Sequence, residues 1–249
     1  MERITSRKNE KIQQLRRLAS DGDYRRARGL YLCDGMKTLR EALRFGARID
    51  VVLWREKAQE LEGLSCGEQF EAPADLFDYA SPMVNSPGPL FAVEIAQHGE
   101  PDRWENALVL ENVQDPGNVG TVIRTANALG IEAVILCGDC ADLYHPKTVR
   151  ATMGAIFRQK VLTMEPEQLR PFLDERGLAL YGAALSDEAR EVRTLSLKNC
   201  AVAVGSEGRG LSRELLASCE GKVIIPMQPD SESLNAAVAA GILMWEMVR

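Results

Sequence analysis

A single arginine, Arg124, stands in a segment whose residue types are typical of a functional site, Glu111 to Gly130. A guanidinium is effectively always protonated, so Arg124 is suited to binding an anionic group and not to accepting a proton. Thr121 and Thr125 share its side of the helix predicted here, opposite the apolar positions. The pattern therefore predicts a cation held off the core on a rigid element.

A second block contains Gly205, Gly208 and Gly210 in the pattern G-x-x-G-x-G. This order differs from the dinucleotide-binding fingerprint, and no acidic ribose-binding residue follows on a second strand. Together with Pro226 and the segment Ser233-Leu234-Asn235, the glycines predict a slot lined by backbone, which a flat adenine can approach closely.

The elements that position Arg124 follow one another without a gap. Ala107 to Leu110 are apolar enough for a buried strand, and Asp115-Pro116-Gly117 predicts a tight turn. Asn118 stands where a helix N-cap is expected, and Gly130 at the C′ position that ends the helix. One face of this helix is apolar, through Val119, Val122, Ile123, Ala126 and Leu129. Such strand-to-helix corners are where α/β proteins build sites.

These blocks resemble the three motifs of the SpoU/TrmH family, the RNA 2′-O-ribose methyltransferases of the SPOUT superfamily. Residues 111–130 resemble motif 1, residues 204–212 motif 2 and residues 223–240 motif 3. Their order and spacing fit the family, as does the intervening segment from Cys140 to Arg158. Three ordered motifs are far more specific than a single glycine loop.

The resemblance implies methylation of a ribose 2′-hydroxyl in structured RNA, with S-adenosylmethionine as the cofactor. It assigns catalytic roles to Asn118, Arg124, Glu207, Ser233 and Asn235. It assigns cofactor contacts to Gly205, Ser206, Gly208, Ile225, Met227 and Leu234. Ser206 departs from the asparagine that is frequent in the family, which implies altered hydrogen bonding there. Glu207 is expected to orient Arg124 or the substrate loop, and either an RNA phosphate or water is left as the proton acceptor.

Each of these residues also has a structural interpretation. Asn118 and Ser233 are suited to capping helices, Glu207 to being a solvated loop acid, and Arg124 to being a surface cation. It is their joint occurrence in the three motifs that favours the functional interpretation.

Charge is distributed unevenly along the chain, whose formal net charge is −6. Residues 1 to 60 hold 15 Lys and Arg against 9 Asp and Glu, whereas the remainder holds 15 against 27. A basic segment on an acidic body is expected when one module contacts phosphates and the other does chemistry, and a solvated helix face is the alternative. The predicted RNA-binding residues are Lys8, Lys11, Arg16, Arg17, Arg25, Arg26, Arg28 and Arg209.

The order of predicted elements indicates an α/β protein of two domains. Residues 1–97 form a small α/β domain, which resembles the RNA-binding, ribosomal-protein-like domain found in many family members. Residues 98–104 are polar and form the predicted linker, and residues 105–249 form the methyltransferase domain. Alternating strands and helices in the second domain predict a parallel sheet covered on both faces. From the resemblance alone, its C-terminal segment forms a trefoil knot whose loops, after Ala183-Ala184, Val204 and Ile225, bind the cofactor.

Composition excludes several other classes of protein. Six cysteines without a secretion signal indicate reduced thiols, and the lone pair Cys137 and Cys140 lacks the second pair of a structural zinc site, so no metal is expected. The longest apolar run, Ala236 to Trp245, is too short to cross a bilayer. A cytoplasmic protein is therefore expected.

Two further expectations concern partners. The N-terminal domain favours ribosomal RNA over transfer RNA, although a transfer RNA methyltransferase and a catalytically silent RNA-binding or ribosome-assembly protein stay open as alternatives. A nucleotide-dependent oxidoreductase would need the fingerprint that is absent. The last helix is apolar all round, which predicts a homodimer, with Val238 and Trp245 facing the sheet and Ala240, Leu243 and Met247 facing the partner.

Overall fold

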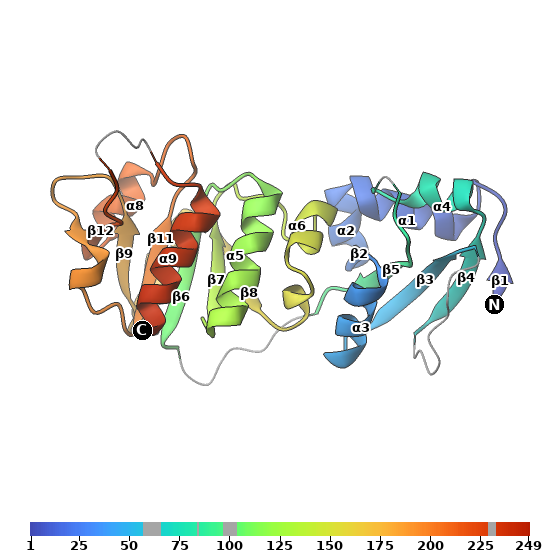
Figure 1. Ribbon diagram of the computed structural model, residues 1–249, viewed down its shortest axis with the longest axis horizontal. Helices are drawn as coiled ribbons and strands as arrows, with labels where there is room; N and C mark the ends of the chain where they lie inside the picture. The colour runs from blue at the N-terminus through green and yellow to red at the C-terminus, as the bar shows by residue number, and fades with distance from the viewer. Residues whose placement is uncertain (57–65, 84, 97–103, 229–232) are drawn as a thin grey trace. The chain divides into compact units, whose positions relative to one another are not determined.

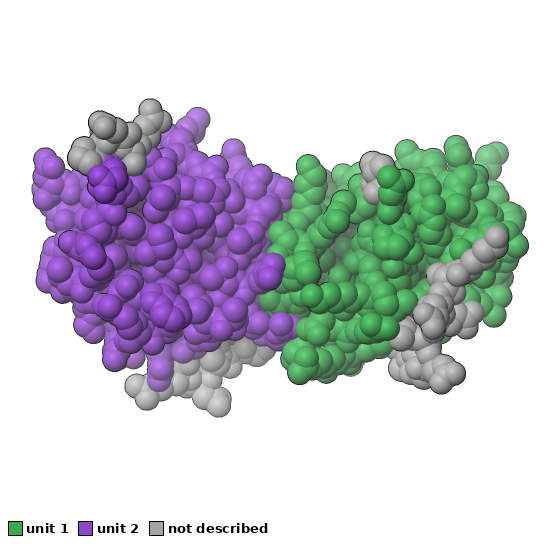
Figure 2. Space-filling view, viewed as in Figure 1, with its two compact units in different colours: residues 1–97, 142–157 green, residues 98–141, 158–249 purple. Residues whose placement is uncertain are grey.

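In the computed structural model the chain divides into two compact units (Figure 2). The structure describes residues 1–56, 66–83, 85–96, 104–228 and 233–249. Unit 1 combines Met1–Gln97 with Asp142–Phe157, and unit 2 combines His98–Ala141 with Arg158–Arg249. The predicted linker, 98–104, lies outside the described residues except for Trp104. Residues 142–157, which the sequence placed in the second domain, belong to the first unit.

Unit 1 is built on a mixed sheet with the strand order β1-β4-β3-β5-β2. Strand β5 runs antiparallel to both β3 and β2. The strands are β1 (Glu2–Arg3), β2 (Leu30–Asp34), β3 (Ile49–Arg55), β4 (Glu68–Ala72) and β5 (Leu90–Glu94). The helices are α1 (Glu10–Ser20), α2 (Gly22–Arg28), α3 (Met36–Arg44), α4 (Ala74–Ala80) and α6 (Pro146–Ala151), followed by η1 (Ala155–Phe157). This agrees with the predicted small α/β domain, to which the sequence did not assign β1.

Residues 8–28 contain two helices, α1 and α2, which meet at Asp21. Asp21 adopts an extended backbone, with φ −123° and ψ 105°, at the end of α1. Its side chain then accepts a hydrogen bond from the Tyr24 amide and caps α2. Because the N-cap residue must leave helical geometry, the capping aspartate separates the two helices.

The two faces of the unit 1 sheet are covered by different parts of the chain. Apolar residues of α1 and α4 pack on one face, including Ile12, Leu15 and Phe77. Residues of α3 and of the segment 142–157 pack on the other, including Val149 and Phe157. The segment 142–157 therefore completes the core of unit 1, although it lies between strands of unit 2 in the sequence.

Unit 2 contains a parallel sheet of seven described strands, in the order β10-β12-β9-β11-β6-β7-β8 (Figure 1). The strands are β6 (Asn106–Glu111), β7 (Ala133–Cys137), β8 (Lys160–Met164), β9 (Ala179–Ala183), β10 (Arg190–Glu191), β11 (Cys200–Val204) and β12 (Gly221–Ile224). The helical segments are α5 (Pro116–Leu129), α7 (Pro166–Glu175), η2 (Val192–Thr194), α8 (Arg213–Ser218) and α9 (Ala236–Val248). The predicted parallel α/β architecture is confirmed, with the edge strands β8 and β10 as additions.

Helices cover both faces of this sheet. Helices α5 and α9 lie side by side on one face (Figure 1), where Gly241 of α9 approaches Thr125 of α5. Leu169 and Leu173 of α7 and Leu215 of α8 pack with the side chains of the other face. The strands are therefore buried on both sides, as their continuous apolar runs indicate.

The orientation of α9 reverses the prediction. Ala240, Leu243 and Met247 are at most 1% exposed, whereas Val238 is 51% and Trp245 58% exposed. Helix α9 thus packs Ala240, Leu243 and Met247 inward, and the bulky Trp245 is left outside. No described helix has the length and apolarity that a membrane span requires.

Candidate active site

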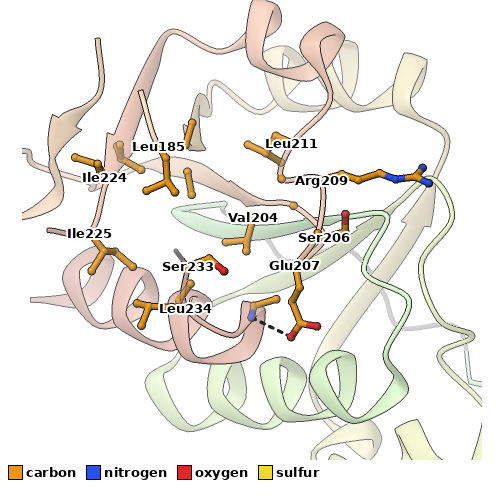
Figure 3. Close-up of a pocket in the computed structure, with 18 of the residues that line it drawn as sticks. Leu185, Val204, Ser206, Glu207, Arg209, Leu211, Ile224, Ile225, Ser233 and Leu234 are labelled. Atoms are coloured by element: carbon orange, nitrogen blue, oxygen red, sulfur yellow. Dashed lines mark hydrogen bonds between the residues drawn. The ribbon is translucent and has the colours of Figure 1, made fainter. Parts of the chain in front are cut away.

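Three of the predicted catalytic residues form one hydrogen-bonded cluster. Asn118 donates from Nδ2 to Oε1 of Glu207 at 2.7 Å, and Asn235 donates from Nδ2 to the same oxygen at 2.6 Å. The amide of Asn235 also lies 3.1 Å from Oδ1 of Asn118, and the backbone amide of Ala236 lies 3.4 Å from Glu207 (Figure 3). The structure thus joins one residue from each of the three sequence blocks.

Two helix starts hold this cluster. The N-cap of α5 is Asp115, whose Oδ1 accepts from the amide of Asn118 at 2.8 Å, so the predicted capping role of Asn118 is wrong. Its side chain is thereby left to contact Glu207. Asn235, and not Ser233, caps α9 by accepting from the amides of Ala237 and Val238.

A buried carboxylate fixes the loop that carries Glu207. Glu111, at the end of β6, is 1% exposed and accepts from the amide of Ser212 at 2.7 Å and from its hydroxyl at 2.6 Å. Ser212 in turn caps α8 through the amide of Leu215. Because a buried charge is costly unless it is hydrogen-bonded, this pair ties the first block to the second. This pair was not predicted, although Glu111 and Ser212 lie within the first and second motif segments.

A pocket of about 610 Å³ opens at the carboxyl ends of β9, β11 and β12, beside this cluster (Figure 3). Its wall includes the loops predicted to bind the cofactor, which follow Ala183-Ala184, Val204 and Ile225. All six predicted cofactor residues line it, namely Gly205, Ser206, Gly208, Ile225, Met227 and Leu234. Of the predicted catalytic residues, Glu207 and Ser233 line it as well.

At Gly205 the pocket wall is made of closely packed backbone. A Cβ atom there would lie 2.1 Å from the carbonyl carbon of Gly210 and 2.3 Å from the nitrogen of Leu211. The loop 205–211 therefore folds back on itself, with the amide of Gly210 donating to the carbonyl of Ser206 at 2.8 Å. Leu185, Val204 and Leu234 add apolar side chains to this backbone surface (Figure 3). Such a surface fits a flat, uncharged ring with a polar edge.

A second pocket of about 630 Å³ lies across the same loop. Residues 206–211 line both pockets, so this loop is their common wall. The other side of the second pocket consists of Asn118, Asp139 and residues 112–115.

Arg124 lies on the exposed side of α5, and it lines neither of these two pockets. Glu207 hydrogen-bonds to Asn118 and Asn235, and no hydrogen bond or ion pair joins Arg124 to Glu207 among the described residues. The predicted orienting contact from Glu207 to Arg124 is therefore not formed. Arg209, by contrast, lines both pockets.

The predicted RNA-binding cations of unit 1 differ in exposure. Arg25 is 3% exposed, and its guanidinium contacts Asp142 at 2.5 Å and the carbonyl of Leu18 at 2.7 Å. Arg25 is therefore a buried anchor for the segment 142–157 and is removed from the RNA-binding set. The side chains of Arg16, Arg17, Arg26 and Arg28 are exposed, as is Lys8, while Lys11 is partly buried. A basic stripe on α3 that was not predicted is formed by the exposed residues Lys37, Arg40 and Arg44.

The cysteines have no reactive environment. Burial raises the pKa of the Cys137 thiol to about 12. Burial also raises the pKa of Cys140, whose Sγ donates to the carbonyl of Leu110 at 3.2 Å. Within the described ranges no group of His, Cys, Asp and Glu is arranged to hold a metal ion.

Comparison with known proteins gives one consistent result. Residues 105–245 match the model of the SpoU rRNA Methylase family. The 23S rRNA (guanosine(2553)-2′-O)-methyltransferase RlmP of Bacillus subtilis is 30% identical, over 99% of both chains. A 23S rRNA (uridine(2479)-2′-O)-methyltransferase of Streptomyces viridochromogenes is also 30% identical, over 99% of this chain and 92% of its own.

Solved structures agree along nearly the whole chain. The AdoMet-bound rRNA methyltransferase from Sinorhizobium meliloti superposes with a TM-score of 0.88 at 26% identity, covering 99% of this chain and 97% of its own. The SpoU methyltransferase AviRb from Streptomyces viridochromogenes, in complex with the cofactor AdoMet, gives a TM-score of 0.84 at 25% identity, covering 96% of this chain and 98% of its own.

Proposed function

Because the chain belongs to the SpoU rRNA Methylase family, we propose that it is an enzyme that methylates a ribose 2′-hydroxyl in ribosomal RNA, with S-adenosylmethionine as methyl donor. The observation that carries this proposal is the cluster of Asn118, Glu207 and Asn235 at the edge of the pocket that all six predicted cofactor residues line. We place the protein in the cytoplasm, where ribosomal RNA is available.

The residues of the first pocket fit this cofactor. S-adenosylmethionine carries no phosphate, and the pocket offers backbone and apolar side chains from Leu185, Val204, Ile225 and Leu234 in place of a phosphate-binding loop. When bound, the cofactor supplies an activated methyl group on a sulfonium. We further propose that the loops around this pocket belong to a trefoil knot, as the family resemblance implies.

The polar residues orient the acceptor ribose. Glu207 holds the amides of Asn118 and Asn235, which fixes the pocket edge where the two reactants meet. Arg124 clamps a phosphate next to the target ribose and stabilises the developing oxyanion. Because a guanidinium stays protonated, the proton of the 2′-hydroxyl leaves to an RNA phosphate or to water.

The exposed cations of unit 1 supply the affinity for RNA. Lys8, Arg16, Arg17 and Arg28 lie on α1, α2 and the segment before them, and Lys37 and Arg40 lie on α3. Such a distribution neutralises phosphates without reading sequence. Ribosomal RNA is favoured as the substrate because the relatives that match along the whole chain are named for it.

A homodimer completes the proposal. Val238, Ile242 and Trp245 form an exposed apolar stripe at i, i+4 and i+7 on α9, and they are 51%, 36% and 58% exposed. An exposed stripe of large apolar side chains marks an interaction surface. A second copy of α9 is the expected partner, in place of the face that the sequence suggested.

The test combines binding with transfer. The purified protein is incubated with tritiated S-adenosylmethionine and total ribosomal RNA from a strain lacking the gene, and ribose methylation is mapped against the parent strain. We expect label on a ribose 2′-oxygen, and about 2.7 kcal/mol of stabilisation at a hundredfold excess of cofactor over its Kd. Cofactor binding without transfer to RNA would identify a silent RNA-binding protein instead, and transfer to transfer RNA alone would reassign the substrate.

A further inference from the structure

The second pocket has a wall that none of the functional assignments above uses. It is formed by the loops that follow β6 and β7, at the carboxyl ends of two neighbouring parallel strands. The backbone amide of Asp139 donates to Oδ1 of Asn112 at 2.8 Å, and Nε2 of Gln114 donates to Oδ2 of Asp139 at 2.7 Å. The amide of Ala141 donates to the carbonyl of Val113 at 2.9 Å. These bonds hold the two loops together as one surface.

The backbone conformations of Asn112 and Gly138 allow the loops after β6 and β7 to lie in close contact. Asn112 has a φ of 54°, which is uncommon for a residue with a Cβ but tolerated by asparagine. Gly138 has a φ of 68°, and a Cβ there would lie 2.6 Å from Oδ1 of Asn112. The Asn112 side chain therefore fills the space that the missing Cβ leaves, and its hydrogen bond to the Asp139 amide holds the backbone that carries the Asp139 side chain.

The charged and hydrogen-bonding side chains of this wall determine which ligands it favours. Asp115, Asp139 and Glu207 bring carboxylates and Arg209 a cation, so carboxylates outnumber cations in the lining and the pocket favours hydrogen-bond donors. One oxygen of Asp139 accepts from Gln114, and the other makes no hydrogen bond to another described residue. The carbonyl oxygen of the Gln114 side chain is likewise without a donor among the described residues. Asp139 and Gln114 are exposed side chains that each keep one acceptor oxygen, and both line this pocket.

We propose that the second pocket binds the base of the target nucleotide, and that Asp139 and Gln114 accept hydrogen bonds from the donor edge of guanine. The inference rests on the proposed function. Guanine presents two adjacent donors, N1–H and the 2-amino group, whereas uracil presents one donor between two carbonyl oxygens. Adenine and cytosine each pair a donor with a ring-nitrogen acceptor, which a carboxylate disfavours.

The position of the pocket places the ribose where the reaction requires it. Glu207 lines both pockets, and Asn118, which hydrogen-bonds to it, lines the second. A base in the second pocket and a methyl donor in the first then bring the ribose to their common edge. Sequence-specific recognition of RNA commonly uses such unstacked bases, read on their Watson–Crick edge. Similar relatives named for guanosine and for uridine leave the base open, so local chemistry must decide it.

The first experiment identifies the methylated nucleoside and its dependence on Asp139. RNA labelled with tritiated S-adenosylmethionine is digested to nucleosides, and we expect the label in 2′-O-methylguanosine. Asp139→Asn should lower kcat/KM for RNA about 10- to 100-fold, the usual effect of losing a hydrogen bond to a charged group, with an unchanged Kd for S-adenosylmethionine. Asp174→Asn, on the exposed surface of α7, is the matched control and should behave as wild type. Label in another nucleoside, or wild-type kcat/KM for Asp139→Asn, would overturn the inference.

A second measurement does not depend on methyl transfer. Guanosine 5′-monophosphate and inosine 5′-monophosphate differ only in the 2-amino group, and their Kd values are measured by calorimetry in the presence of S-adenosylhomocysteine. We expect the wild type to bind the guanine nucleotide about tenfold more tightly than the inosine nucleotide. The Asp139→Asn variant should bind the two nucleotides with equal Kd values. Equal binding of both nucleotides to the wild type refutes the base assignment, while absence of methyl transfer to any RNA refutes the proposed function alone.

Discussion

The side chains of Asn118 and Glu207 are joined by a 2.7 Å hydrogen bond, although 89 residues separate them in the chain. Asn118 lies in the first turn of α5, and Glu207 lies in the loop after β11. Because β11 and β6 are neighbours in the parallel sheet, the loops at their carboxyl ends lie together. Adjacency of strands, and not proximity in sequence, therefore assembles the candidate site.

Replacing Glu207 tests whether turnover depends on the hydrogen-bonded cluster of Asn118, Glu207 and Asn235. Glu207→Ala removes the oxygen that accepts from both Asn118 and Asn235, so we expect turnover to fall tenfold or more, which is about 1.4 kcal/mol of transition-state stabilisation. Glu207→Gln keeps one acceptor and should be less damaging. Turnover is measured with tritiated S-adenosylmethionine. Glu214→Ala, in the first turn of α8, is the control, and equal turnover in Glu207→Ala and the control would remove Glu207 from the site.

The glycines of the pocket loop should differ in their tolerance of a methyl group. Gly205→Ala places a Cβ 2.1 Å from the backbone of Gly210, and overpacking of this kind costs about 1–3 kcal/mol of unfolding free energy. Gly208→Ala meets no atom within 4 Å and should leave stability nearly unchanged. Urea unfolding without cofactor measures both. Similar stabilities for the two variants would show that the loop does not fold back as described.

Arg124 should matter for the substrate and not for the cofactor. It is exposed and lines neither of the two pockets described here, so Arg124→Ala should abolish transfer with a nearly unchanged Kd for S-adenosylmethionine. Arg124→Lys should be almost as damaging, because the two-pronged guanidinium contact with a phosphate is lost. Single-turnover transfer and calorimetry measure the two effects. Near-normal transfer by either variant would contradict the proposed clamp.

Replacement of Arg25 should affect the stability of the protein, whereas replacement of Arg28 should affect RNA binding. Arg25→Ala breaks a buried ion pair with Asp142 and should lower the unfolding free energy by about 3 kcal/mol. Arg28→Ala should leave stability unchanged and weaken RNA binding, with the slope of log K against log salt falling by about 0.9 for a lost duplex phosphate contact. Unfolding curves and binding at several KCl concentrations measure these effects. An unchanged salt slope for Arg28→Ala would make Arg28 a solvated surface cation.

These point variants are preferable to removal of residues 1–97. The segment 142–157 packs its Val149, Ile156 and Phe157 into the core of unit 1, so the truncation would expose them. Residues 98–249 alone are therefore not expected to fold as a separate domain, because the segment 142–157 would lose the core of unit 1 against which it packs.

The exposed face of α9 should control oligomeric state. Trp245→Glu places a charge on the apolar stripe and should convert a dimer into a monomer of 27.5 kDa, measured by light scattering at micromolar concentration. Phe45→Glu, at the end of α3 in unit 1, should not change the mass. Leu243→Glu is unsuitable for this test because Leu243 is 0% exposed, and a charge buried there would destabilise the protein. A wild-type mass near 27.5 kDa would reject the dimer.

Local patterns in the sequence were sufficient for the parallel sheet, whereas the family and most pocket residues followed from the resemblance of the three motifs to a known family. Apolar runs predict strands and glycines predict turns, because strands and turns depend mainly on residues that are close in sequence. The exposed position of Arg124 on α5 and the end of that helix at Gly130 followed from the same reasoning. The order of the three motifs then indicated methylation of a ribose 2′-hydroxyl.

Only the tertiary structure decided which of two candidate residues caps a helix and which face of α9 is buried. Asp115 and Asn118 are both capping residue types, and the choice depends on Glu207, which lies in a distant loop. Helix α9 is apolar all round, so periodicity contains no information on its orientation, and its fit against α5 and the sheet decides it. Likewise, the burial of Arg25 depends on Asp142, 117 residues away, which no local pattern specifies. Contacts between residues that are distant in sequence are absent from local patterns, and these contacts build the site.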